Sequence, residues 1–356
     1  MRSKLRKMAC SGLFAFILVC FNFYHSHAQT PGGVSSSLKL WLKANNGPEN
    51  GSALPATNGD AISVWRDRSG NANDYTVVAG PTYQDNTLNF NPSVEIQSGG
   101  FDGPAGAALS TNWSVFFVSQ KLASDNNGRL FDGHISNYLW AHWGNYTNSI
   151  YLNGNPSNYN SGIATTTGIQ NLHLHSYLRE SAGGTLEARA DGVSLNTFGA
   201  GASASGVRID INQGAFTATE ASHSRVGEMI IYDVKLTATE VNRVESYLGL
   251  KYGLTLAHDY LAASGTTVWD YAAFSGYNNN ILGIGRDDAS GLDQRKSTSL
   301  NAGADLTIDN GAAFGSDAQF IVVGDNNAAN GTSTDHPGAY AKRLNKVWLA
   351  RVTGAP

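Results

Sequence analysis

The feature that most constrains the fold of this chain is a succession of short segments in which apolar and polar residues alternate. Leu38–Leu42 is the first of them, with an apolar side chain at every second position. Gly, Asn, Ser and Asp cluster between such segments, and these residues favour turns. Alternation with a period of two gives a strand one face for the core and one for solvent. The pattern predicts an all-β protein built from antiparallel sheets.

The expected strands share this alternation, or an apolar run bounded by turn residues. They are Leu38–Leu42, Ile62–Trp65, Ser93–Ile96, Ser114–Ser119, Gly128–Phe131, Tyr138–His142, Ser149–Leu152, His173–Arg179, Leu186–Ala190, Val207–Ile211, Arg225–Asp233, Asn280–Arg286, Ala304–Ile308, Gln319–Val323 and Asn345–Val352. Residues 45–60 are rich in Gly, Asn and Pro and are expected to form a loop. The composition agrees with many turns and few amphipathic helices, since Gly supplies 40 of 356 residues and only 15% are charged.

One helix is expected between Thr237 and Gly253. Thr237 and Glu240 form a capping box, in which the hydroxyl and the carboxylate each satisfy a free backbone N–H. The apolar side chains that follow are spaced three and four residues apart and mark one helical face. They are Val241, Val244, Leu248 and Tyr252. Gly253 provides the C-terminal stop.

The N-terminus has the layout of a secretory signal peptide. Residues 2–7 are rich in Lys and Arg, an apolar run extends from Leu13 to Phe23, and Ser26-His27-Ala28 offers small residues for cleavage. A membrane span needs roughly 20 apolar residues, so this shorter run is not expected to cross a bilayer. Residues 1–28 are therefore predicted to be removed, and the protein to be secreted or displayed at the cell surface.

Removal of this segment changes both the cysteine content and the charge. Cys10 and Cys20 lie within it, so the mature chain has no disulfide and must be held by its core. Four basic residues leave with the segment, which takes the formal charge from −4 to −8. No run of Lys and Arg follows residue 7, and nucleic acid requires such clusters. Nucleic acid is therefore excluded as a partner.

Four stretches, taken in order, resemble the laminin-G-like (concanavalin A-like) domains of secreted Bacteroidetes surface proteins. They are SLKLWLKA, SVWRDRSGNAND, EARADGVSL and RVGEMIIYDVKLTATEVNRVESYLGLKYGLTL, which span residues 37–256. The resemblance implies a two-sheet antiparallel jelly-roll sandwich with one short C-terminal helix. It also implies carbohydrate or protein binding at the cell surface, and it makes a calcium ion plausible.

A second resemblance concerns NILGIGRDDASGLDQRKS at residues 280–297. This stretch resembles a β-rich domain of unassigned function that follows such sandwiches in long surface proteins. We therefore expect a signal peptide at 1–28, a sandwich at 29–257, and a second β-rich domain at 258–356. The last strand has no partner after it, so this second domain is expected to be truncated.

A glycosidase on this fold would need two carboxylates on one face. Retaining hydrolysis needs them about 5 Å apart, and alternate positions of one strand provide that most simply. The glucanase pattern E-x-D-x-x-E or E-x-D-x-E is not found in the sequence, and Asp210 stands alone on its expected strand. A catalytic role is therefore not predicted, although carboxylates from different strands could converge.

Sugar binding would use aromatic faces beside hydrogen-bonding side chains. The densest aromatic stretch lies between residues 138 and 151, and its members are the candidate ligand contacts. They are Tyr138, Trp140, His142, Trp143, Tyr146 and Tyr151. Tyr138, Trp140 and His142 share one face of the expected strand, with Leu139 and Trp143 on the other, and one of these faces must belong to the core.

Metal candidates fall into two groups. Calcium prefers hard oxygen ligands, which Asp125 and Asn127, and again Asp325 and Asn327, could supply. These residue types also gather in turns for conformational reasons. His173-Leu-His175 places two imidazoles on one strand face, a spacing that suits zinc, but no third ligand is evident.

Other motif residues are expected to be structural. They are Trp65, Asp67, Ser69, Gly70, Asn71, Asp191, Gly192, Thr237 and Glu240. Asp67, Ser69 and Asn71 suit side-chain hydrogen bonds to a tight turn, and Trp41 and Trp65 are expected in the core.

The leading hypothesis is an exported, non-catalytic binding or adhesion module with a glycan or a surface protein as its partner. Two alternatives remain open, a glycan-active enzyme (glycoside hydrolase or lyase) on the same fold and a structural spacer within a large surface protein. An exposed, concave arrangement of the residue 138–151 aromatics would favour a binder over a spacer.

Overall fold

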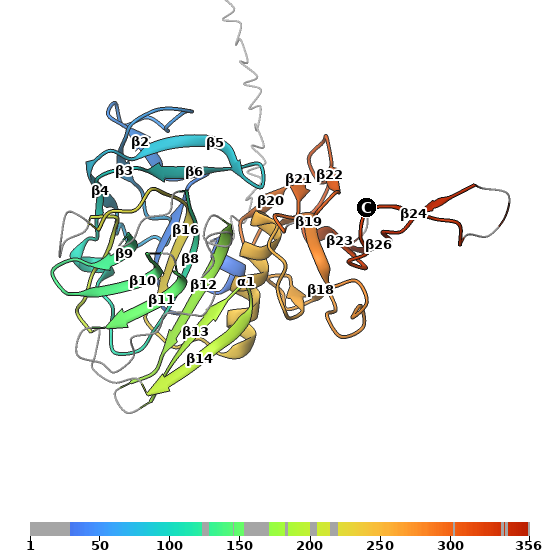
Figure 1. Cartoon of the computed structure of the whole chain (residues 1–356). Coiled ribbons are helices and arrows are strands. Elements are labelled where there is room, and N and C mark those ends of the chain that lie inside the picture. The colour runs from blue at the N-terminus through green and yellow to red at the C-terminus, as the bar shows by residue number, and fades with distance from the viewer. Residues whose placement is uncertain are drawn as a thin grey trace, which may run out of the picture.

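The structure is a computed structural model of the chain (Figure 1). It describes residues 29–122, 128–144, 146–152, 171–181, 184–199, 205–213, 220–301, 303–335, 338 and 341–354. The predicted signal peptide, Asp125 and Asn127 lie outside these residues. Within the described part, no helix has the length and apolar character needed to cross a membrane.

Two antiparallel eight-stranded sheets pack face to face as a sandwich (Figure 1). Sheet A has the spatial order β14 (Val193–Gly199), β13 (Thr185–Ala190), β12 (Leu172–Arg179), β8 (Trp113–Lys121), β16 (Ser224–Tyr232), β6 (Asn91–Ile96) and β5 (Thr82–Leu88), with β1 (Leu38–Lys43) also paired to β16. Sheet B has the order β11 (Tyr146–Leu152), β10 (Tyr138–Trp143), β9 (Arg129–Gly133), β15 (Ile209–Ile211), β7 (Gly100–Asp102), β4 (Tyr75–Ala79), β3 (Ile62–Trp65) and β2 (Pro48–Asn50). Short 3-10 turns occupy Pro31–Gly33 (η1) and Ala105–Ala107 (η2).

The sandwich core lies between the inner faces of the two sheets. Phe117 of β8 stacks on Phe131 of β9, with ring centroids 4.0 Å apart. Trp65 and Trp113 are fully buried in the same cluster. Trp41 is also buried, as expected, but it lies in the second core on the outer face of sheet A.

A single α-helix among the described residues, α1 (Ala238–Tyr252), covers the outer face of sheet A. The capping box of Thr237 and Glu240 is present, and Gly253 ends the helix with φ at 66°. Val244 and Leu248 are fully buried in one cluster with outward-facing residues of β8. Each such aliphatic side chain contributes roughly 2 kcal/mol by its burial.

The C-terminal region packs on the other side of α1 (Figure 1). Its four-stranded sheet C has the order β20 (Leu292–Gln294), β19 (Asn279–Asp287), β23 (Gln319–Asp325) and β26 (Trp348–Thr353). Two-stranded pairs join β17 (Tyr260–Leu261) to β18 (Thr267–Trp269), β21 (Lys296–Thr298) to β22 (Thr307–Asp309), and β24 (Thr332–Ser333) to β25 (Arg343–Leu344). Trp269 and Phe320 belong to the same buried cluster as the helix. The helix is therefore shared by two parts of the molecule.

A buried charge network joins α1 to sheet A. Glu228 of β16 is fully buried and accepts hydrogen bonds from Trp41 Nε1 at 2.7 Å and from Tyr247 Oη at 2.8 Å. Lys251 of α1 forms an ion pair with the same carboxylate. The preceding residue, Gly227, is required by this packing, because a Cβ there would lie 2.8 Å from the ring of Tyr252.

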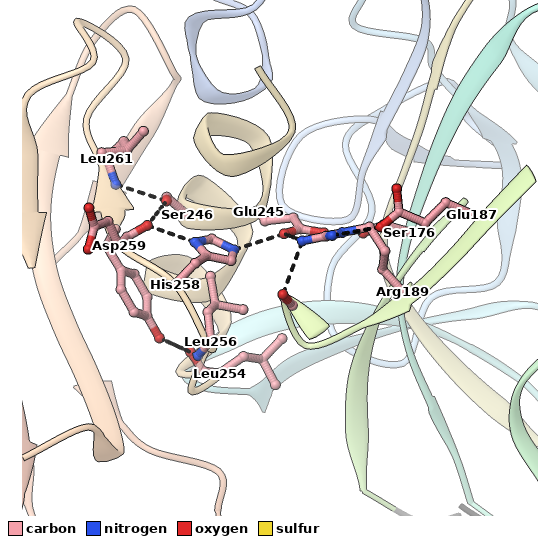
Figure 2. A network of polar contacts seen from close by, with 12 residues as sticks. Ser176, Glu187, Arg189, Glu245, Ser246, Leu254, Leu256, His258, Asp259 and Leu261 are labelled. Atoms are coloured by element: carbon pink, nitrogen blue, oxygen red, sulfur yellow. Dashed lines mark hydrogen bonds and ion pairs between the residues drawn. The ribbon is translucent and has the colours of Figure 1, made fainter. Parts of the chain in front are cut away.

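A second network connects sheet A, α1 and the segment that leads into the C-terminal region (Figure 2). The buried Glu245 of α1 accepts hydrogen bonds from Ser176 Oγ and Arg189 Nε, both at 2.9 Å. Its other oxygen lies 2.8 Å from His258 Nε2, and His258 Nδ1 lies 2.7 Å from the carbonyl oxygen of Asp259. Burial raises the pKa of Glu245, but the hydrogen bonds from His258 and Arg189 outweigh it and leave that pKa at about 2.

The structure confirms the predicted fold class, an all-β antiparallel sandwich with one α-helix in its described part. Some elements differ. The expected loop at 45–60 contains β2, and β4, β5, β7 and β14 were not expected. β5 and β14 lie at sheet edges and are partly exposed, so they show little alternation, and β7 has only three residues. The segment Ala304–Ile308 is corrected to β22, and the last strand begins at Trp348. The domain boundary at residue 257 stays a prediction.

Candidate binding pocket on sheet B

The candidate site is a pocket of about 360 Å³ on the outer face of sheet B. It is lined by Arg129, Asn137, Leu139, Trp143, Ile150, Tyr151 and Glu220. β10 and β11 form an antiparallel pair in which Leu139 lies opposite Tyr151, so neighbouring strands supply the apolar lining. Trp143 and Tyr151 are both half-buried, which leaves part of each ring accessible.

Arg129 organises the polar side of this pocket. Its guanidinium donates to Asn137 Oδ1 at 3.1 Å, forms an ion pair with Glu220, and lies 5.3 Å from the ring centroid of Trp143. The residue is only 4% exposed. Among the described residues its Nε has no hydrogen-bond partner. A buried guanidinium held in this way is fixed in position.

The arrangement suits a small polar ligand with an apolar face. Binding pockets commonly combine aromatic walls with a few placed hydrogen-bonding groups, and Trp143 and Tyr151 provide the first while Arg129, Asn137 and Glu220 provide the second. The ion pair between Arg129 and Glu220 balances the local charge. The pocket therefore has no excess of either charge on its described lining.

The structure corrects the predicted ligand contacts for one strand face. Tyr138, Trp140 and His142 point into the sandwich, where Trp140 and His142 are 0% exposed and Tyr138 is 8% exposed. Tyr138 and Trp140 stack at 6.1 Å within the core, so neither ring is open to a ligand. Tyr146 lies opposite Trp143 but does not line the pocket. Alternation identified the two faces of the strand, but not which of them was the core.

Asp325 and Asn327, the described calcium candidates, form a turn. Asp325 is 1% exposed, and its Oδ1 accepts the backbone N–H of Asn327 at 2.8 Å while Oδ2 accepts Asn280 Nδ2 at 2.8 Å. These contacts account for both residues without an ion. Calcium at this turn stays a prediction.

The expected structural residues make structural contacts. Asp67 Oδ1 accepts the backbone N–H of Trp41 at 2.9 Å and that of Ser69 at 2.8 Å. Asn71 Nδ2 donates to the carbonyl oxygen of Leu38 at 2.9 Å, so this turn holds the β1 strand. Gly70 has φ at 91°. The hairpin between β13 and β14 likewise turns at Asp191 and Gly192, both with positive φ.

One cluster of possible metal ligands was missed by the sequence reasoning. Asp102, His134 and Asp210 bring one ligand atom each within 4.8 Å of the others. His134 Nδ1 lies 2.9 Å from Asp210 Oδ2, so two of the three groups are already paired with each other. Burial raises the pKa of Asp210. The three residues come from separate segments of the chain, so no spacing in the sequence predicts that they meet.

A second hollow lies on sheet C. It has a volume of about 540 Å³ and a largely apolar lining, across which Ile284, Ile321 and Val352 are cross-strand neighbours. Val352 is 48% exposed. Nothing in the described residues shows what would cover it.

A model of the family described as "Domain of unknown function (DUF8202)" matches residues 240–356. The match begins inside α1, upstream of the boundary expected from the sequence at residue 257. A comparison with curated protein sequences finds no match.

Several solved structures are distantly similar. Domain 4 of AbnA, a GH43 extracellular arabinanase from Geobacillus stearothermophilus in complex with arabinotriose, is 13% identical with a TM-score of 0.44, over 60% of this chain and 98% of that one. Trypanosoma rangeli sialidase in complex with sialic acid is 14% identical with a TM-score of 0.43, over 60% of this chain and 33% of that one. The binding domain of botulinum neurotoxin DC in complex with rat synaptotagmin II is 11% identical with a TM-score of 0.39, over 90% and 72%. The fold assignment itself rests on the strand pairings above.

Proposed function

We propose that this chain is an exported, non-catalytic module that binds a glycan in the Trp143–Tyr151 pocket of sheet B. One observation carries the proposal. Two partly accessible aromatic rings from adjacent strands, Trp143 and Tyr151, line one pocket together with the polar side chains of Arg129, Asn137 and Glu220, and the Arg129 guanidinium lies 5.3 Å from the Trp143 ring centroid. Sugars offer an apolar C–H face to aromatic rings and hydroxyls to polar side chains.

The carboxylates at the pocket support binding rather than hydrolysis. Among the described lining residues only Glu220 is acidic, and it is paired with Arg129. Hydrolysis of a glycosidic bond generally requires two carboxyl groups. A glycan held by stacking and hydrogen bonds needs neither.

The proposal also includes secretion of the protein and a role in adhesion at the cell surface. The basic and apolar residues before Gln29 support secretion to the cell surface, and the ordered resemblance to laminin-G-like domains of Bacteroidetes supports a role in adhesion. The C-terminal region, fixed to the sandwich through α1, would present the pocket at a set orientation.

The test is binding of the chain lacking residues 1–28 to a broad glycan array, with calcium and with chelator. We expect reproducible binding to a small set of glycans and at least a tenfold weaker signal for Trp143→Ala and Tyr151→Ala. Tyr146→Ala is the matched control, because Tyr146 is an aromatic residue of the same strand as Tyr151 and does not line the pocket. A loss with chelator would add calcium to the site.

Two outcomes would overturn the proposal. No binding in either buffer would leave a protein-binding adhesin or a spacer. Binding that survives both pocket substitutions in folded protein would place the glycan elsewhere. Circular dichroism and thermal unfolding of each variant would establish that it is folded.

A further inference from the structure

Three histidines meet inside one end of the sandwich, and one of them, His142, directly precedes the pocket residue Trp143 in β10. His173 and His175 project from the inner face of β12, and His142 projects from β10 of the opposite sheet. The rings of His142 and His175 lie 5.0 Å apart between centroids, and those of His173 and His175 lie 6.0 Å apart. The sequence indicated the pair on β12, and the structure supplies the third imidazole.

Each ring is held through one nitrogen by an oxygen atom. His142 Nε2 lies 3.0 Å from Ser119 Oγ, and His175 Nδ1 lies 3.3 Å from Asn148 Oδ1. In the third ring, His173 Nδ1 lies 2.8 Å from the carboxylate of Asp191. Histidines that bind metals typically have their second nitrogen anchored in this way, which fixes the tautomer and directs the other lone pair.

The remaining nitrogens of the two inner rings have no partner. His142 Nδ1 and His175 Nε2 make no hydrogen bond with any described residue, and both side chains are 0% exposed. An unsatisfied buried polar atom is costly, and neutral imidazole nitrogen is a common metal ligand.

We infer that His142 and His175 form a binding site for one divalent transition-metal ion of the zinc type, with His173 as the third ligand. Two imidazoles on one tetrahedral zinc, with Zn–N near 2 Å, place their centroids about 5 Å apart, which matches the inner pair. The three histidine nitrogens do not all lie within 4.8 Å of one another, because only the Asp102 cluster does so among the described residues. Binding therefore requires rotation of the His173 side chain.

The side chains around the three histidines affect how a metal ion could enter and which metal ions the site would prefer. His173 lines a polar pocket of about 390 Å³ that also contains Asp191 and Asn327, so the third histidine is the one that an ion can reach from this pocket. Imidazole ligands suit zinc, copper and nickel, whereas calcium and magnesium prefer oxygen. Lys121 donates to the carbonyl oxygen of Gly144 at this end of the sandwich and opposes a cation, and the Asp191 carboxylate offsets part of that charge.

The test is zinc binding by the chain lacking residues 1–28, after treatment with chelator and dialysis. Titration calorimetry is expected to show one zinc ion per chain, and thermal unfolding to shift upward with zinc but not with calcium or magnesium. His142→Ala and His175→Ala should each weaken zinc binding at least tenfold. His134→Ala is the matched control, since it removes an imidazole from the Asp102 cluster and should leave the affinity unchanged.

A measurement on the unaltered sequence guards against variants that do not fold. In chain labelled with ¹⁵N-histidine, zinc should shift the Nδ1 resonance of one ring and the Nε2 resonances of others. Zinc uptake that fails, or that is lost in His134→Ala and retained in His175→Ala, would overturn the inference. So would histidine resonances that do not respond to saturating zinc.

Discussion

The two outer faces of the sandwich differ in whether another element covers them. The outer face of sheet A is covered by α1, and polar residues beneath the helix, Glu228 and Ser176, are fully buried and paired. The outer face of sheet B at β9–β11 is open, and its aromatic residues Trp143 and Tyr151 are half-buried around a pocket. One face is therefore part of a buried core, and the other keeps aromatic side chains partly accessible. Substitutions on the two faces should separate these roles.

The largest effect is expected under the helix. Glu228→Ala leaves the ammonium group of Lys251, which is 3% exposed, buried without its carboxylate. Breaking a buried pair in this way costs about 3–5 kcal/mol of the free energy of unfolding. Urea denaturation measures it, and Glu180→Ala, which removes an exposed partner of Lys235, is the control with a loss below about 1 kcal/mol. Equal losses in both variants would mean that Glu228 is not buried as described.

A direct comparison of the faces uses one apolar and one aromatic truncation. Leu248→Ala, at a fully buried position of α1, is expected to cost about 3 kcal/mol. Tyr151→Ala, at the open pocket, should cost less than about 1 kcal/mol, as most surface substitutions do. Urea denaturation of both variants tests the contrast. A larger loss from Tyr151→Ala would show that the pocket wall is part of the core.

Acid should weaken the covered face through Glu245. Its folded pKa of about 2 lies below the ordinary value of 4.5, so its stabilisation is complete above about pH 4.5 and is lost as the pH falls toward 2. The shift in the pKa of Glu245 corresponds to a stabilisation on the order of 3 kcal/mol in total. Only part of this stabilisation is lost by pH 3. Stability measured between pH 6 and pH 3 should fall in the wild type and fall less steeply in Glu245→Gln. An unchanged slope in that variant would contradict the pKa assignment.

The smallest effect concerns the start of α1. Thr237→Ala removes the hydroxyl that accepts the backbone N–H of Glu240 and should cost about 1 kcal/mol. Glycan binding should not change, since the cap lies on the covered side. A change in affinity without a change in stability would link the two faces in a way that the structure does not show.

The parts of the fold that could be predicted are those governed by local chemistry. The capping box, the α1 apolar face and the Asp67 turn all follow from residues close together in sequence. What could not be predicted depends on distant pairing. Trp143 and Arg129 meet only because β10 pairs with β9, and His142 meets His175 only because two sheets pack face to face. Alternation shows that a strand has two faces and leaves the identity of the core face open.

The shared helix has a mechanical consequence. Its buried residues belong to one core with sheet A and with Trp269 and Phe320 of the C-terminal region, and Glu245 ties Arg189 to His258 across it (Figure 2). Rotation of one part against the other would expose apolar surface and leave buried charged groups without their partners. A force applied to a ligand at sheet B would therefore be transmitted to the C-terminal strands with little movement of the two parts relative to each other.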